Sequence, residues 1–188
     1  MNCMRIGGHR KKRKQWIAGA FGVCAAVVAD QLTKELAYRN LKLSGKGFVT
    51  LIPGVLELRY LENRGAAFGM LQNRLPLFIL FAAAVSLAAI ICYIRVPDSR
   101  RYLALRVCMA GLTEGAVGHL IDRIFRGYVI DFIYISLIHF PIFNVADICV
   151  SLSAGLLLIL MLFVYRDGEL EIWTRSGSQD GKDEKNDE

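Results

Sequence analysis

Four apolar segments, each about 20 residues long, constrain this chain more than any other feature of its sequence. They cover residues 16–38, 75–94, 103–125 and 146–165. A helix rises about 1.5 Å per residue, so about 20 residues cross the hydrocarbon core of a bilayer. An open strand would leave its backbone groups unpaired in lipid, so each segment is expected to be helical. The sequence therefore predicts an α-helical integral membrane protein with four transmembrane helices.

The net charge of +6 is unevenly distributed along the chain. Residues 1–165 carry a charge of +10, and the polar residues 166–188 carry −4. A basic chain can bind nucleic acid, but basic nucleic-acid-binding proteins are rarely 54% hydrophobic. We therefore expect no nucleic-acid partner. Residues 166–188 lack apolar periodicity and are expected to form a disordered cytoplasmic tail.

Basic residues also predict the orientation in the membrane. Residues 1–15 contain six basic residues and no acidic one, and the connector after the second segment carries Arg95, Arg100, Arg101 and Arg106. Two spans separate these regions, so they lie on one side, which the positive-inside rule makes cytoplasmic. Residues 39–74 carry six basic and two acidic residues and weaken this prediction. We expect residues 1–15 to be a cytoplasmic tail, both termini to be cytoplasmic, and residues 16–165 to form the membrane domain.

The loop after the first segment is expected to contain a β region over about residues 44–70. Residues 48–52 and 55–61 are apolar runs on either side of Pro53-Gly54, and this dipeptide suits a type II turn. In the second run apolar and charged residues alternate, which is the period of a half-buried strand. The pattern predicts a small antiparallel hairpin at the outer membrane surface.

Charged residues at membrane depth are costly and are therefore candidates for function. Asp30 and Lys34 are four residues apart near the outer end of the first segment and can pair on one helix face. A structural ion pair that closes a helix bundle explains them as well. Asp122, on the third segment, can face Lys34 or the neighbours of Arg123, whereas Arg123 can extend to the interface. A structural or site-shaping role is favoured over chemistry for this group.

Asp131 and Asp147 flank one short outer loop and can lie at the same depth. Asp131 can equally be a solvated loop carboxylate, and Asp147 can be a first-turn residue that complements the helix dipole, with Asn144 as N-cap. However, two acids in a low-dielectric cleft cannot both ionise easily. One then keeps its proton while the other acts as a base, as in an aspartic protease.

Other polar residues give weaker signals. The five cysteines contain no CxxC pattern, so neither a disulfide framework nor a zinc site is expected. His119 lacks a partner set for haem or metal, and Glu114 has no explanation from the pattern alone. Gly111, Gly115 and Gly118 share the small-residue spacing of closely packed helices.

Five motifs follow one another along the chain, namely Asp30-Gln31-x-Thr33-Lys34, Asn63-x-Gly65-Ala66-Ala67-Phe68-Gly69, Asp122-Arg123, Val129-x-Asp131-Phe132 and Phe143-Asn144-x-Ala146-Asp147. Together these motifs resemble those of the lipoprotein signal peptidase (signal peptidase II) family. Each motif alone is weak, but their order on a four-span scaffold is specific. The resemblance covers roughly residues 16–166.

The resemblance implies an intramembrane aspartic endopeptidase of the bacterial cytoplasmic (inner) membrane, with an outer β-cradle and an active site near the outer leaflet. It would cleave diacylglyceryl-modified prolipoproteins before the lipidated Cys, as a monomer among membrane lipids and without cofactor or metal. Asp131 and Asp147 would be catalytic. The residues that would bind substrate or support the site are Asn63, Arg123, Asn144, Asp122, Asp30, Lys34 and His119.

Two residues depart from the family pattern. His119 stands where members usually carry Asn, and Glu114 replaces a small residue, which leaves the hydrogen bonds around the acids open. Two other classes of function are compatible with the residues alone. One is a small transporter or proton-pathway subunit that uses the buried acids, and the other is a non-enzymatic membrane adaptor.

Overall fold

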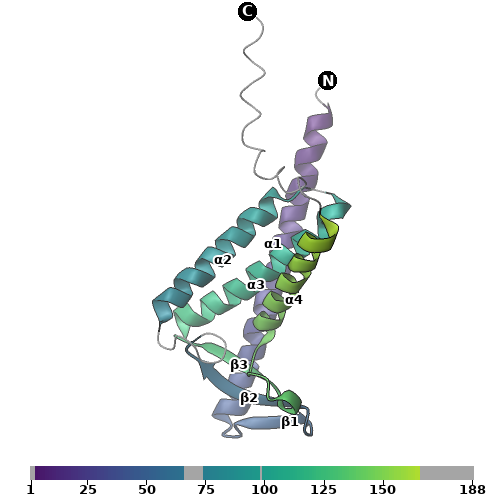
Figure 1. Ribbon diagram of the computed structural model, residues 1–188. Coiled ribbons are helices and arrows are strands. Elements are labelled where there is room, and N and C mark those ends of the chain that lie inside the picture. Colours follow the sequence, from purple (N-terminus) through teal and green to yellow (C-terminus); the bar gives the residue numbers. More distant parts are fainter. Residues whose placement is uncertain (1–2, 66–73, 98, 166–188) are drawn as a thin grey trace, which may run out of the picture.

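The computed structural model describes residues 3–65, 74–97 and 99–165, with side chains described from residue 13 onward (Figure 1). The motif residues 66–69, the end of the expected β region at residue 70 and the expected tail at 166–188 lie outside these ranges.

Each of the four apolar segments forms a helix. They are α1 (Cys3–Ala37), α2 (Leu75–Arg95), α3 (Leu103–Phe125) and α4 (Val145–Ile159). Short turns extend three of them, namely η1 (Tyr38–Leu43), η3 (Arg100–Tyr102) and η5 (Leu160–Val164). Helix α1 begins at Cys3 rather than at residue 16, so most of the expected basic tail continues the helix. Lys and Arg are good helix formers, and no proline interrupts this stretch.

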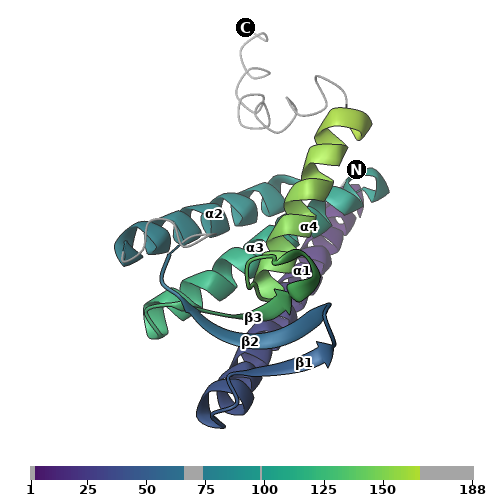
Figure 2. The same cartoon turned by 60° about the horizontal axis from the view of Figure 1, so that its bottom comes forward.

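Within the described ranges, three helices are long and apolar enough to cross a membrane, over residues 13–43, 75–95 and 145–164. Helix α3 is not among them, because charged residues interrupt it at Arg106, Glu114, Asp122 and Arg123. It packs against α1, α2 and α4, and both figures of the whole chain show it inside the bundle (Figure 1, Figure 2). Arg106, Glu114 and Asp122 of α3 are buried in the protein, whereas large apolar side chains such as Phe21, Phe81 and Leu152 are exposed on the outer helices.

Small residues let α3 approach its neighbours closely, as the glycine spacing predicted. A Cβ added at Gly111 would collide with Ser153 Oγ of α4. At Gly115 it would lie 2.8 Å from the backbone oxygen of Ala146, and at Gly118 2.8 Å from Asp30 Oδ2 of α1. The absence of a side chain at these glycines therefore lets α3 lie close to both α1 and α4.

The three-stranded antiparallel sheet has the order β1 (Phe48–Ile52), β2 (Leu56–Asn63) and β3 (Val129–Ile135). The predicted hairpin of β1 and β2 is confirmed. Its turn places Gly54 at φ 71°, and Val55 N donates to Ile52 O at 3.0 Å, as a type II turn requires. The sheet lies at the end of the bundle opposite the start of α1 (Figure 1, Figure 2).

Strand β3 was not predicted from the sequence. Its first four residues are all buried, so the apolar–polar alternation that marks a half-buried strand is missing. Asp131 consequently lies within a strand, and its interpretation as a solvated loop carboxylate was wrong. The connection from α3 to α4 is correspondingly not one short loop, because it contains β3 and the turn η4 (Ser136–Ile138).

Candidate active site

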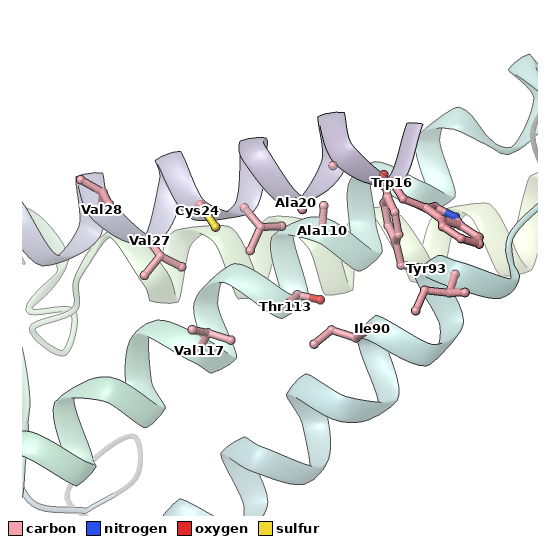
Figure 3. A pocket seen from close by; sticks show the side chains of 13 residues that line it. Trp16, Ala20, Cys24, Val27, Val28, Ile90, Tyr93, Ala110, Thr113 and Val117 are labelled. Atoms are coloured by element: carbon pink, nitrogen blue, oxygen red, sulfur yellow. The ribbon is translucent and has the colours of Figure 1, made fainter. Parts of the chain in front are cut away.

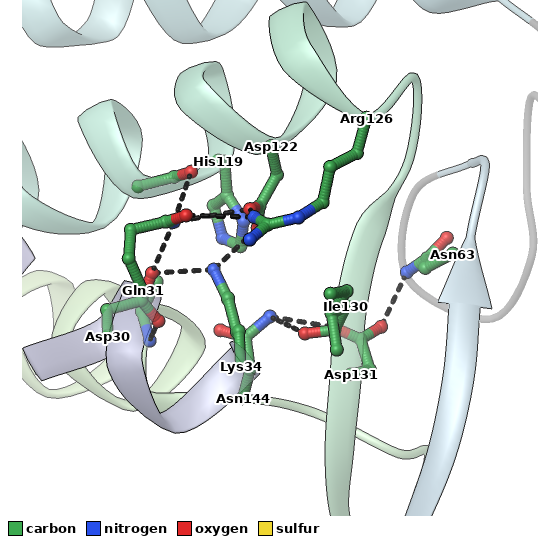
Figure 4. A network of polar contacts seen from close by, with 12 residues as sticks. Asp30, Gln31, Lys34, Asn63, His119, Asp122, Arg126, Ile130, Asp131 and Asn144 are labelled. Carbon is green, nitrogen blue, oxygen red and sulfur yellow. Dashed lines mark hydrogen bonds and ion pairs between the residues drawn. The ribbon is translucent and has the colours of Figure 1, made fainter. Parts of the chain in front are cut away.

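Asn144 contacts both acids of the predicted pair. Its side-chain Nδ2 donates to Asp131 Oδ1 at 2.7 Å (Figure 4). Its backbone N–H donates to Asp147 Oδ2 at 2.9 Å. The Asn144 side chain also accepts from Asp147 N at 3.0 Å, which completes a capping box at the start of α4. The predicted N-cap is therefore confirmed, and the same residue joins α4 to β3.

Asp131 is held in the sheet and is almost completely buried. It is only 2% exposed, and it pairs with Leu61 across the β2–β3 ladder. Asn63, at the end of β2, donates its Nδ2 to Asp131 Oδ2 at 2.9 Å. Two carboxamides thus bind the two oxygens of one buried carboxyl group.

Asp147 lies in the first turn of α4 and is more open, since its side chain is 38% exposed. His119, on α3, places its Nε2 3.2 Å from Asp147 Oδ1. Each oxygen of Asp147 therefore faces one nitrogen, the backbone N–H of Asn144 or the imidazole. The two acids differ in both burial and partners.

Burial and the nearby charge of Asp147 raise the pKa of Asp131 to about 6. The hydrogen bonds from Asn63 and Asn144 act in the opposite direction and lower that pKa, but by less. A carboxyl group with a raised pKa, next to a more exposed carboxyl group, has the asymmetry that an acid–base pair requires.

A buried charge cluster lies behind this pair. Lys34 Nζ is 2.6 Å from Asp30 Oδ2 and 2.7 Å from Asp122 Oδ2, and all three side chains are fully buried (Figure 4). The predicted Asp30–Lys34 pair and the approach of Asp122 to Lys34 are confirmed. Asp30 Oδ1 also accepts from Ala146 N at 3.1 Å. The cluster thus joins α1 and α3 to the residue that precedes Asp147.

Two members of this network were missed as site residues. Gln31 Nε2 donates to Asp122 Oδ1 at 3.2 Å, and Arg126 Nη1 contacts both Asp122 Oδ1 and Gln31 Oε1. The i, i+4 spacing of Asp122 and Arg126 was the available signal. Arg123 lies apart from them, with Nη2 3.4 Å from Gly65 O and its guanidinium 4.8 Å from the centre of the Phe78 ring.

A cavity of about 600 Å³ lies between α1, α2 and α3 (Figure 3), and its walls are almost entirely apolar. None of the predicted site residues lines it. Among the described residues, no group of three or more His, Cys, Asp or Glu could hold a metal ion.

Residues 23–163 match the family model described as signal peptidase (SPase) II. This match covers more than half of the chain. The chain belongs to the signal peptidase II family. A lipoprotein signal peptidase from Symbiobacterium thermophilum is 46% identical over 145 residues, which cover 76% of this chain and 93% of the relative. A lipoprotein signal peptidase from Brevibacillus brevis is 41% identical, and the alignment covers 78% of this chain and 95% of the relative.

Two solved structures of bacterial membrane enzymes have a fold similar to that of this chain. Two bacterial membrane enzymes, solved by the in meso method, are 30% and 29% identical to this signal peptidase II family member, with TM-scores of 0.68 and 0.67. The first alignment covers 77% of this chain and 87% of the other, and the second covers 79% and 94%. Together with three membrane-spanning candidates, these matches make the protein a bacterial membrane peptidase.

Proposed function

We propose that this protein is an aspartic endopeptidase that cleaves diacylglyceryl-modified prolipoproteins just before the lipidated Cys. As a family member, it removes signal peptides from prolipoproteins. The observation that carries the aspartic mechanism is Asn144, which binds a buried and a more exposed carboxyl group at once. The compared relatives are peptidases by name, and none of those names favours the transporter or adaptor alternative.

The proposed topology has four transmembrane helices and both termini in the cytoplasm. The arginine-bearing connector between α2 and α3 lies at the same end of the bundle as the start of α1 (Figure 1), and both regions are basic. Helix α3 serves as the fourth span, since its charged groups pack against protein rather than lipid. The sheet and the acid pair then lie at the outer side of the cytoplasmic membrane, near the outer leaflet.

In the proposed reaction Asp147 begins ionised and Asp131 begins protonated, in keeping with their exposure. Asp147 takes a proton from water as the hydroxyl oxygen bonds to the scissile carbonyl carbon. Asp131 gives its proton to the carbonyl oxygen, which produces a gem-diol. The gem-diol then returns a proton to Asp131 while Asp147 protonates the nitrogen and the C–N bond breaks. Both acids regain their starting states.

The remaining site residues have supporting roles in this proposal. Asn63 and Asn144 orient the carboxyl group of Asp131 through their amides. Arg123 borders the substrate side, beside Gly65. Asp30, Lys34 and Asp122 fix the start of α4. In this proposal the protein acts as a monomer, and the exposed apolar side chains of its outer helices contact membrane lipids.

The test is cleavage of a diacylglyceryl-modified prolipoprotein by the purified protein in lipid nanodiscs. Asp131→Asn and Asp147→Asn each remove one titrating group at nearly constant volume and should lower the rate by at least about 10²-fold. Glu57→Gln, on β2, is the matched control and should cleave normally. Cleavage near the wild-type rate by either Asp variant would contradict the proposal. Ion flux in proteoliposomes without peptide cleavage would instead support the transporter alternative.

A further inference from the structure

The two acids of the pair have chemically different partners. Asp131 is bound by the carboxamides of Asn63 and Asn144, whereas Asp147 is bound by one backbone N–H and faces one imidazole. That imidazole belongs to His119 on α3, so it reaches Asp147 from a different helix. The nitrogen–oxygen distance of 3.2 Å is within hydrogen-bonding range.

We propose that His119 is a positioning residue that donates its Nε2–H to Asp147 as a neutral imidazole and holds this acid as the ionised member of the pair. This inference deepens the proposed function and rests on it. His119 does not contact the reacting atoms in this proposal. It acts on the orientation and charge of Asp147.

The other ring nitrogen decides the protonation state. Nδ1 of His119 is buried and has no hydrogen-bond partner among the described residues. An imidazolium would therefore bury a charged N–H without an acceptor, which is more costly than an unpaired neutral acceptor. The tautomer with hydrogen on Nε2 leaves only a lone pair at Nδ1. It also directs its single N–H at the Asp147 carboxylate.

The charged groups near the pair of His119 and Asp147 are consistent with a neutral donor. Helix α1 contributes Lys34 and Asp30, and Lys34 already pairs with two carboxylates. Helix α3 contributes Arg123 and the buried Glu114, strand β3 contributes Asp131, and α4 contributes Asp147 itself. Both Lys34 and Arg123 act electrostatically on Asp147. Among the groups that favour the ionised form of Asp147, the hydrogen bond from His119 contributes most.

The geometry also fixes the direction of the carboxylate. Asn144 N–H binds Oδ2 and His119 binds Oδ1, so the two donors hold both oxygens of Asp147 and limit rotation of the group. A neutral side-chain amide at position 119 can supply the same type of donor. An aliphatic side chain of similar size cannot.

The first test compares His119→Asn with His119→Leu in nanodiscs, using the diacylglyceryl-modified prolipoprotein. Loss of a hydrogen bond to a charged group should lower kcat of His119→Leu by about 10- to 100-fold with little change in KM. His119→Asn should recover most of that loss. His139→Asn, at an exposed site, is the matched control and should leave kcat unchanged. Equal rates for the Asn and Leu variants would overturn the proposal.

The second test does not depend on activity and so separates this inference from the proposed function. In a His9→Gln, His139→Asn background, His119 is the only histidine, and its ¹⁵N resonances report the tautomer directly. We expect a neutral ring with hydrogen on Nε2 at pH 7, and a shifted Nε2 resonance in Asp147→Asn. A doubly protonated ring, a hydrogen on Nδ1, or no response to Asp147→Asn would overturn the role of His119, even if His119→Leu failed to fold.

Discussion

Asn144 Nδ2 lies 2.7 Å from Asp131 Oδ1, although the two residues belong to different elements. The same Asn144 is the N-cap of α4, and its backbone N–H binds Asp147. A single capping residue therefore sets both the start of the helix and the relative positions of the two acids. Substitutions of Asn144 can test the two effects separately, because one side chain can keep the cap and lose the contact with Asp131 whereas another loses both.

Asn144→Asp is expected to keep the helix cap and lose the activity. Aspartate is as good an N-cap as asparagine, so thermal stability should change little from lost capping. The new carboxylate cannot donate to Asp131 Oδ1, so the hydrogen bond that orients the carboxyl group of Asp131 is lost. We expect a large fall in kcat, measured with the diacylglyceryl-modified substrate alongside thermal unfolding in nanodiscs.

Asn144→Ala is the companion variant and removes both functions. It should lower the free energy of unfolding by about 1 kcal/mol through the lost cap, in addition to lowering kcat. If Asn144→Asp cleaved as well as the wild type, the contact between Asn144 and Asp131 would not matter for the reaction.

Activity is expected to fall as the pH rises through the pKa of Asp131. Burial and the charge of Asp147 raise that pKa to about 6, and the proposed reaction needs the protonated form of Asp131. The proton is lost above this pH, so the alkaline limb of kcat/KM against pH should have its midpoint near pH 6. The acids interact, so the midpoint belongs to the pair. A rate that increased steadily from pH 6 to pH 8 would contradict this assignment.

Replacing Lys34 is expected to destabilise the fold strongly. Lys34→Met leaves Asp30 and Asp122 buried without their shared cation, and removal of one partner from a buried charge cluster typically costs about 3–5 kcal/mol. The exposed pair of Arg39 and Glu35 provides the control. Arg39→Met should change the free energy of unfolding by less than about 1 kcal/mol. Thermal unfolding of both variants in the same detergent measures the difference. Similar melting temperatures would contradict the stabilising contribution expected of Lys34.

Much of this site could be predicted from spacing alone. The i, i+4 spacing of Asp30 and Lys34 predicted their contact, and Asn144 was predicted as the N-cap of the helix that carries Asp147. The glycines of α3 predicted its close approach to α4. These features are local, or depend on one helix face, and a single sequence records them.

The contacts that cross between distant elements could not be predicted in this way. Strand β3 has no alternating pattern because its first half is buried on both faces, so nothing in the sequence revealed that Asp131 pairs with Leu61 of β2. The hydrogen bond from Ala146 N to Asp30 likewise depends on how α1 crosses α4. The contact of His119 with Asp147 depends on the packing of α3 against α4, which spacing within α3 does not encode.

Gly115 is expected to be needed for activity because a side chain at this position would displace α4. A Cβ at this site would lie 2.8 Å from the backbone oxygen of Ala146, the residue before Asp147, so Gly115→Ala must push the first turn of α4 away from α3. Gly155→Ala is the control, because a Cβ at Gly155, on α4, meets nothing within 4 Å. Since alanine is the better helix former, the control should keep its activity and gain up to about 1 kcal/mol of stability. Gly115→Ala should lose cleavage because displacement of Asp147 disturbs its contacts with Asn144 and His119. Equal cleavage rates for the two variants in nanodiscs would show that the approach of α3 to α4 does not set the geometry of the acid pair.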